Sequence, residues 1–115
     1  MRKDDLIRIT HMLEAGNKAL SFAAGRTRDD LAQDEMLVYA LMKAIEIVGE
    51  AAGKVSPATK EQFDNIPWIR IVGMRNRLIH AYNDISLDIL WHTVTDNLPP
   101  LMKALERIVA TELSE

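Results

Sequence analysis

The 115-residue sequence contains no cysteine, and it has only nine glycine and proline residues together and six aromatic ones. Without cysteine there can be no disulfide, no thiolate zinc site and no thiol nucleophile, which fits a reducing cytosol. The scarcity of glycine and proline argues against a β-sandwich or barrel, which needs many tight turns. A basic excess is also missing, since 14 Lys and Arg face 17 Asp and Glu for a formal net charge of −3. This balance argues against a protein that is held to nucleic acid by bulk charge alone.

Long hydrophobic runs are lacking as well. The first apolar residues are interrupted by Arg8 and His11, so we expect no signal peptide. The most apolar stretch, residues 36–48, carries two charges and is too short to cross a bilayer. We therefore expect a cytoplasmic protein that has no contact with a membrane, and a single domain over residues 1–115.

Helical periodicity, in contrast, extends over nearly the whole chain. Apolar residues recur every three or four positions, and no alternating run of β-branched residues predicts a strand. We expect five helical segments. The first runs from Leu6 to near Gly25, and a central one follows the acidic stretch from Thr27 and stops near Gly53. A short segment runs from Pro57 to about Phe63, the next begins at Pro67 and ends at Asn83–Asp84, and the last begins after the cap Ser86. The pattern predicts an all-α fold, an antiparallel bundle of about four to five helices.

Two features refine this bundle. The apolar stripe of the central segment is wide, which predicts burial on two sides. Pro99 and Pro100 interrupt the stripe of the last segment, and Pro99 cannot donate to the carbonyl of Thr95. We therefore expect a kink or a break there rather than two unrelated helices. A domain of this size buries only about two-thirds of its unfolded surface, so packing against a second copy would add stability.

One part of the sequence carries basic residues without any acidic ones. Residues 65–83 contain Arg70, Arg75, Arg77 and His80 and no aspartate or glutamate. One interpretation is a solvated helix face with ordinary variation in local charge. The other is an anion site suited to phosphate on an otherwise acidic protein.

The spacing within this segment limits what one chain can do. Arg75 and Tyr82 are seven residues apart and share one face of a helix. His80 is five residues from Arg75 and lies well round the helix from it. The arginine and the histidine converge only if the helix ends near His80, or if a second chain supplies the partner of each. A two-fold axis near this segment would bring both copies into one cleft.

Such residues can cut RNA without a metal ion. A neutral imidazole can take the proton from a ribose 2′-hydroxyl, whose oxygen then attacks the adjacent phosphorus. Guanidinium groups stabilise the charge that develops on the non-bridging oxygens. Cleavage leaves a 2′,3′-cyclic phosphate. One histidine cannot be base and acid at once, and a dimer would supply the acid from the second copy.

Residues 75–82, Arg-Asn-Arg-Leu-Ile-His-Ala-Tyr, resemble the Arg-x4-His-x-Tyr signature of HepT-like toxins in the HEPN superfamily. The similarity extends to residues 46–52 (Glu-Ile-Val-Gly-Glu-Ala-Ala), 66–68 (Ile-Pro-Trp) and 88–101, and so covers almost the whole chain in the right order. The resemblance implies a HEPN-like helical homodimer that acts as a metal-independent endoribonuclease and needs no cofactor. It also implies a partner, a minimal nucleotidyltransferase antitoxin encoded next to it.

The resemblance assigns roles to individual residues. It implies that Arg75 and His80 are the catalytic pair and that Asn76 is a supporting polar residue. Tyr82 would be the hydroxyl to which the antitoxin adds AMP from ATP, which silences the nuclease. A bulky anion attached there would occupy the cleft and present its charge to Arg75. Arg77 could bind RNA phosphate or simply hold a carboxylate.

A second function remains open. The chain could be a non-catalytic nucleotide-binding or docking subunit of a nucleotidyltransferase complex, in which Arg75 and His80 only grip phosphate. The remaining histidines, His11 and His92, lack the spacing of a metal site, and we expect both to be exposed or at a boundary.

Three further residues have alternative interpretations. Glu50 is a solvated carboxylate by default, but an inward position would let it orient the neighbouring arginines. Trp68 and Trp91 are expected to lie in the core or in a dimer interface.

Overall fold

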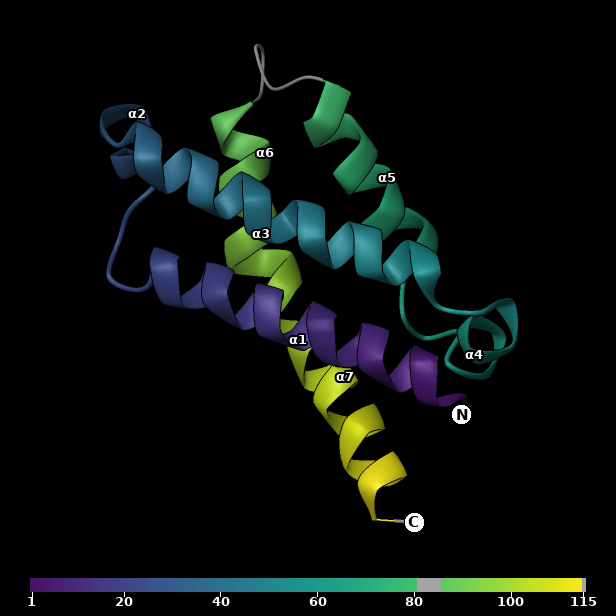
Figure 1. Cartoon of the computed structure of the whole chain (residues 1–115). Coiled ribbons are helices and arrows are strands. Elements are labelled where there is room, and N and C mark those ends of the chain that lie inside the picture. Colours follow the sequence, from purple (N-terminus) through teal and green to yellow (C-terminus); the bar gives the residue numbers. More distant parts are fainter. Residues whose placement is uncertain (81–85, 115) are drawn as a thin grey trace.

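The computed structural model of the chain describes residues 1–80 and 86–114, and for residues 79 and 80 it describes the backbone only. Every regular element in these ranges is helical (Figure 1). In chain order they are α1 (Lys3–Ala23), α2 (Asp30–Gln33), α3 (Glu35–Lys54), α4 (Pro57–Gln62), α5 (Trp68–His80), α6 (Leu87–His92), the π-helical turn η1 (Thr93–Asn97) and α7 (Leu98–Leu113). The prediction of an all-α bundle is confirmed.

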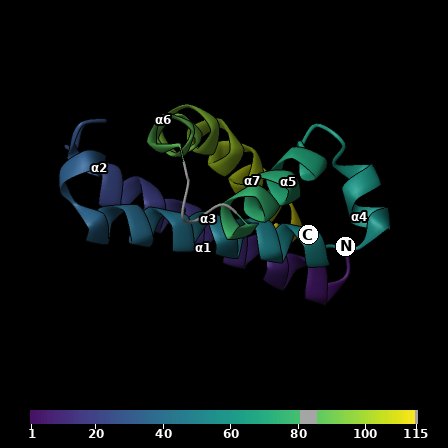
Figure 2. The ribbon, with the colours of Figure 1, turned by 90° about the horizontal axis from the view of Figure 1, so that it is seen from above.

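The helices form two layers. α1 and α3 lie side by side and make one layer, while α5 and the rod formed by α6, η1 and α7 lie over it (Figure 2). α3 packs along both α1 and α5, and α1 also contacts α7. The molecule measures 46 × 28 × 19 Å, so it is long and only two helices deep. α3 is the central element, because it contacts both α1 and α5 extensively.

The burial pattern of α3 agrees with this central position. Leu41, Ile45 and Val48 are buried, and so are small residues such as Ala44 and Ala52, which face the neighbouring helices. The predicted burial on two sides is confirmed. Because helices pack as close as their facing side chains allow, the small residues let α1 and α5 approach α3 closely.

The start of this helix differs from the prediction. We expected the acidic stretch after Thr27 to lead into one long helix. Asp30 instead accepts a hydrogen bond from the Thr27 amide and begins the short α2. Asp34 then adopts an extended backbone, and its carboxylate accepts a hydrogen bond from the Leu37 amide at 3.1 Å. Asp34 is therefore the N-cap of α3. The sequence did not single it out as the cap, because several nearby aspartates are equally good N-cap residues.

Most predicted helix ends are confirmed. α1 ends at Ala23, and Gly25 just beyond it has a φ of 73°, which glycine tolerates best. Ser56 caps α4 and Ser86 caps α6, each by accepting a hydrogen bond from the amide three residues later. Trp68 at the start of α5 is buried, and its ring nitrogen donates to the Phe63 carbonyl at 3.0 Å. Trp68 is thus a core residue.

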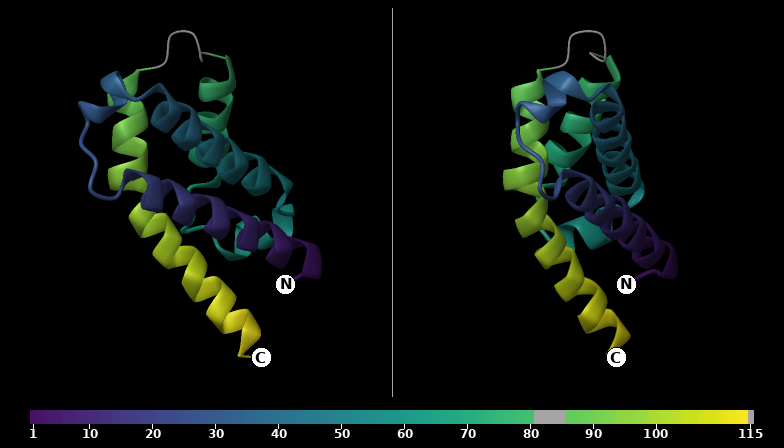
Figure 3. Two further views of the ribbon diagram at one scale, coloured as in Figure 1. Left: turned by 60° about the vertical axis from the view of Figure 1, so that its left-hand side comes forward. Right: turned by 90° about the vertical axis from the view of Figure 1, so that its left-hand side faces the viewer.

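The last helical rod is continuous across the two prolines. α6, η1 and α7 follow one another without a gap and form one long rod along the molecule (Figure 3). In η1 the Leu98 amide donates to the Thr93 carbonyl, five residues back, just before the first proline. Of the predicted kink or break, the structure has no break, and α7 runs in a different direction from α6 beyond η1 (Figure 3). The expectation that the prolines do not separate two unrelated helices is confirmed. Leu90, Val94 and Leu105 line the buried side of this rod.

A buried carboxylate joins the start of α1 to the start of α4. Asp5 is 2% exposed and accepts hydrogen bonds from the Ser56 amide at 2.8 Å, the Ser56 hydroxyl at 2.6 Å and the Thr59 hydroxyl at 2.7 Å. Burial acts to raise the pKa of Asp5, but the bonds from Ser56 and Thr59 outweigh it and hold the pKa below its usual value. This cluster ties the N-terminal end of the chain to the turn between α3 and α4.

Candidate active site

The candidate site is built on α5, which carries all three arginines of the acid-free segment. Arg75 is half-buried and lies against α3, opposite Gly49. Its Nη1 donates to the side-chain oxygen of Asn76 at 3.0 Å. Its Nε is buried and has no hydrogen-bond partner within the described structure. Buried donors are nearly always satisfied, so the Nε of Arg75 stands out among the described polar atoms of the chain.

The three arginines are not neutralised by nearby acids. Within residues 1–80 and 86–114, no carboxylate forms a salt bridge with Arg70, Arg75 or Arg77. Arg70 and Arg77 are exposed, as is Asn76. For Arg77, the interpretation as a carboxylate partner therefore finds no support in the described residues. Guanidinium groups that have no carboxylate partner among the described residues are suited to bind phosphate.

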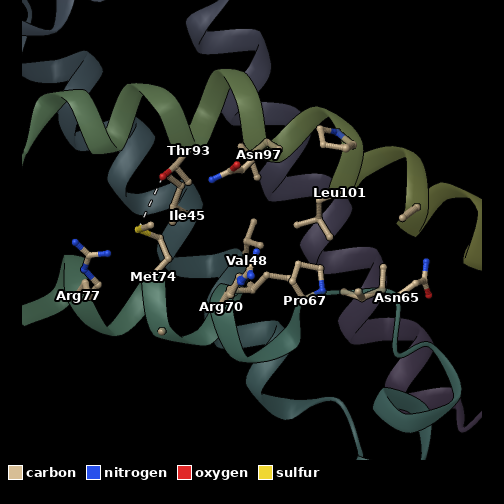
Figure 4. Close-up of a pocket in the computed structure, with 16 residues that line it drawn as sticks. Ile45, Val48, Asn65, Pro67, Arg70, Met74, Arg77, Thr93, Asn97 and Leu101 are labelled. Carbon is tan, nitrogen blue, oxygen red and sulfur yellow. Dashed lines mark hydrogen bonds between the residues drawn. The ribbon is translucent and has the colours of Figure 1, made fainter.

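The same helix borders a groove on its other side. A pocket of about 730 Å³ opens between α5 and the η1–α7 part of the rod, with Ile45 and Val48 of α3 at its floor (Figure 4). Arg70 and Arg77 line it from α5, and Leu101 lines it from α7. Arg75 does not line this pocket, because it faces α3. α5 therefore places its arginines on two different faces.

The backbone of α5 is helical from Arg75 to His80, and the predicted end of the helix at Asn83–Asp84 lies outside the described residues. Five residues at about 100° each place the two Cα atoms about 140° apart around the helix axis. The helix of one chain thus does not by itself bring these residues onto one face. Tyr82, the predicted modification site, lies outside the described residues.

The remaining candidates have ordinary surroundings. Glu50 is exposed and pairs with Lys54 at 3.6 Å, so the alternative in which it turns inward to orient an arginine is wrong. His92 is exposed and contacts Asp96 at 2.6 Å, and His11 is also exposed, as expected.

Two features are absent from the described part of the chain. No group of three histidine, aspartate or glutamate side chains there lies close enough to hold a metal ion. Nor does this part contain a helix that combines the length and apolar character needed to span a bilayer.

Two residues of structural importance were missed in the sequence. Asp5 has its partners more than 50 residues away, and no local pattern indicates them. Gly49 lies inside a long apolar helix, where glycine lowers helix stability relative to alanine. A glycine at such a position is a sequence signal that another element packs closely against it.

Comparison with known proteins identifies the family. The family model described as "Ribonuclease HepT-like" matches residues 12–108, so the chain belongs to the HepT-like ribonuclease family. A protein of Methanocaldococcus jannaschii named "Putative RNase MJ1380" is 35% identical over 83% of this chain and 87% of its own length. "Putative RNase TTE0752" of Caldanaerobacter subterraneus is 30% identical over 90% and 93% of the two chains. "Probable ribonuclease HepT" of Thermococcus cleftensis is 29% identical over 91% and 90%. No solved structure matches significantly.

Proposed function

We propose that the chain is a metal-independent endoribonuclease whose active cleft forms between two copies. The observation that carries this proposal is Arg75, a half-buried arginine whose buried Nε has no partner among the described residues, five residues before His80 on the same helix. Membership of the HepT-like ribonuclease family supports ribonuclease activity in general. The finer assignments below are part of the proposal.

The proposed reaction needs no metal ion. His80 takes the proton from a ribose 2′-hydroxyl, and the oxygen attacks the adjacent phosphorus. Arg75 stabilises the negative charge that grows on the non-bridging oxygens, while Asn76 holds its guanidinium. The 5′-oxygen leaves with a proton from the second copy's histidine, and a 2′,3′-cyclic phosphate remains. Arg77 binds the phosphate of a neighbouring nucleotide.

The homodimer is supported by three observations. Arg75 and His80 are well separated around the axis of α5, so a second chain would complete each half-site. The groove of about 730 Å³ beside α5 is mostly apolar, and Ile69 on α5 is 90% exposed. Apolar surface of this kind commonly marks an interface. Light scattering tests this: a 13.0 kDa particle at working concentration would contradict the dimer.

The test of the nuclease is RNA cleavage by the purified chain in EDTA. We expect the wild type to cut RNA and leave 2′,3′-cyclic phosphate ends, and to spare RNA with 2′-O-methyl groups. His80→Ala should lose about 10²–10⁴-fold in rate, the usual contribution of a general base. His92→Ala is the matched control, since that histidine is exposed and pairs with Asp96. An inert wild type would instead favour the non-catalytic docking subunit of a nucleotidyltransferase complex.

We further propose that the chain is the toxin of a cytoplasmic toxin–antitoxin pair. A minimal nucleotidyltransferase would silence it by adding AMP from ATP to the hydroxyl of Tyr82. Incubation with the neighbouring transferase and ATP should then add the mass of AMP to the intact protein. The shift should disappear in Tyr82→Phe and persist in Tyr39→Phe, because Tyr39 is the other tyrosine and is exposed on α3. No shift in the wild type would contradict the assignment.

A further inference from the structure

α3 and α5 approach each other most closely at Gly49. A Cβ atom built on this glycine would lie 2.7 Å from the Cγ of Arg75 and closer still to its Cβ. It would also lie 3.2 Å from the carbonyl oxygen of Ile71, one turn earlier on α5. The place of the missing side chain is therefore occupied by the stem of Arg75.

The next glycine of α3 shows that this closeness is local. Gly53 is one turn further along the same helix, and a Cβ atom there would meet only the Cγ2 of Val72, at 3.8 Å. That is an ordinary van der Waals contact, which a methyl group could make without any shift. The crossing of the two helices thus leaves room for a side chain at Gly53 and none at Gly49.

We infer that Gly49 is a positioning residue for Arg75. Without a side chain at Gly49, the first two carbons of the Arg75 side chain rest directly on the backbone of α3, which restricts their torsions. The guanidinium is held further out by Asn76. A catalytic cation gains most when it is held in place before the substrate arrives, and a long arginine side chain otherwise loses much rotamer freedom on binding. The inference rests on the proposed nuclease function.

The physical consequence of a methyl group at Gly49 follows directly. Either α5 moves away from α3, or the stem of Arg75 changes rotamer, and both displace the guanidinium. A displacement of about 1 Å in a catalytic group can cost about 10²-fold in rate. The effect should appear in kcat, because Arg77, which is proposed to bind a neighbouring phosphate, lies on another face of α5 from Arg75.

The test compares Gly49→Ala with Gly53→Ala in the full chain. Both variants make the same change on the same helix, and both gain helix propensity. We expect Gly49→Ala to remain folded by circular dichroism, to lower kcat by about 30-fold or more and to change KM by less than about threefold. The Nε–Hε signal of Arg75 in nitrogen–proton spectra should shift. Gly53→Ala should keep the kcat and the Arg75 signal of the wild type.

Each other result overturns the inference. It fails if Gly49→Ala cuts RNA like the wild type, if the loss is in KM alone, or if both alanine variants lose kcat equally. If Gly49→Ala does not fold, Arg75→Gly is added to it, because this change removes the side-chain atoms of Arg75 that would overlap the new methyl group. The double variant should then fold, and a double variant that stays unfolded contradicts the close contact between Gly49 and Arg75. An inert wild type refutes the nuclease proposal and this inference with it, whereas an active wild type with an unaffected Gly49→Ala refutes only the inference.

Discussion

Asp5 and Arg75 are both polar residues with atoms buried inside the bundle, but their surroundings differ. The Asp5 carboxylate accepts three hydrogen bonds from Ser56 and Thr59. Arg75 donates one bond, to its neighbour Asn76, and its buried Nε donates to nothing in the described structure. The Asp5 carboxylate is satisfied by its own chain, whereas the Nε of Arg75 finds no acceptor among residues 1–80 and 86–114.

This difference separates structure from function. A buried charge that is fully hydrogen-bonded stabilises the fold, because removing it leaves its donors without an acceptor. A buried donor without an acceptor costs stability in the free protein, and binding of an external anion can recover that cost. Substitutions at the two residues should therefore have opposite effects on stability and activity.

The largest effect is expected for Arg75→Ala. The rate of RNA cleavage should fall by about 10²–10³-fold, the usual loss when one transition-state donor is removed. The free energy of unfolding should change little, because the alanine removes an unsatisfied donor along with some packing. Cleavage assays and urea unfolding measure the two quantities. Arg107→Ala, at an exposed position on α7, is the control, and an equally large rate loss there would contradict a specific role of Arg75.

The opposite behaviour is expected for Asp5→Ala. The free energy of unfolding should fall by about 2–3 kcal/mol, because the Ser56 and Thr59 donors lose a charged acceptor. Cleavage by the folded protein at low temperature should be unchanged. Urea unfolding measures the loss, with the exposed neighbour Asp4→Ala as the control. If the two variants are equally stable, the Asp5 cluster does not stabilise the fold.

A smaller effect is expected for Asn76→Ala. The side chain of Asn76 is exposed and only holds one nitrogen of Arg75, so we expect a rate loss of about three- to tenfold, which corresponds to about one ordinary hydrogen bond. Asn76→Asp should keep the bond as an acceptor but reduce RNA binding through its negative charge. Steady-state kinetics on both variants checks this. A loss as large as that of Arg75→Ala would mean that Asn76 itself touches the reacting phosphate.

The smallest effect is expected from pH. The folded state lowers the pKa of Asp5 below its unfolded value of about 3.9, so its contribution to stability is complete above that value and is lost as the pH falls through the folded pKa. Urea unfolding between about pH 5 and pH 2 should show this decline. Asp5→Asn should flatten part of it. The part due to Asp34, whose pKa is lowered first by the hydrogen bond from Arg26, should persist.

The sequence predicted the features that depend on near neighbours. The period of apolar residues and the caps Ser56 and Ser86 both depend on residues a few positions apart. The Arg75 motif and its family were also recognisable, because the motif is short and contiguous. The contact between Gly49 and Arg75 was not predictable, since it joins residues 26 positions apart on two helices whose crossing point no local pattern specifies. The partners of Asp5 were hidden for the same reason.

The π-helical turn η1 has a consequence for how the rod tolerates insertions and deletions. Leu90, Val94 and Leu98 are spaced by four residues, which suits the wider turn, and Leu101 and Leu105 continue the buried line in α7. Each residue of a helix rotates the rest of it by about 100°. A π turn takes up one residue more than an α turn, because its hydrogen bond spans five residues instead of four. A single deletion within residues 93–97 would therefore restore a regular α-helix and leave the leucines of α7 on the buried side, whereas a single deletion inside α7 would turn the residues beyond it away from the core. η1 is thus a place where the rod can lose one residue without changing which side of α7 closes the core.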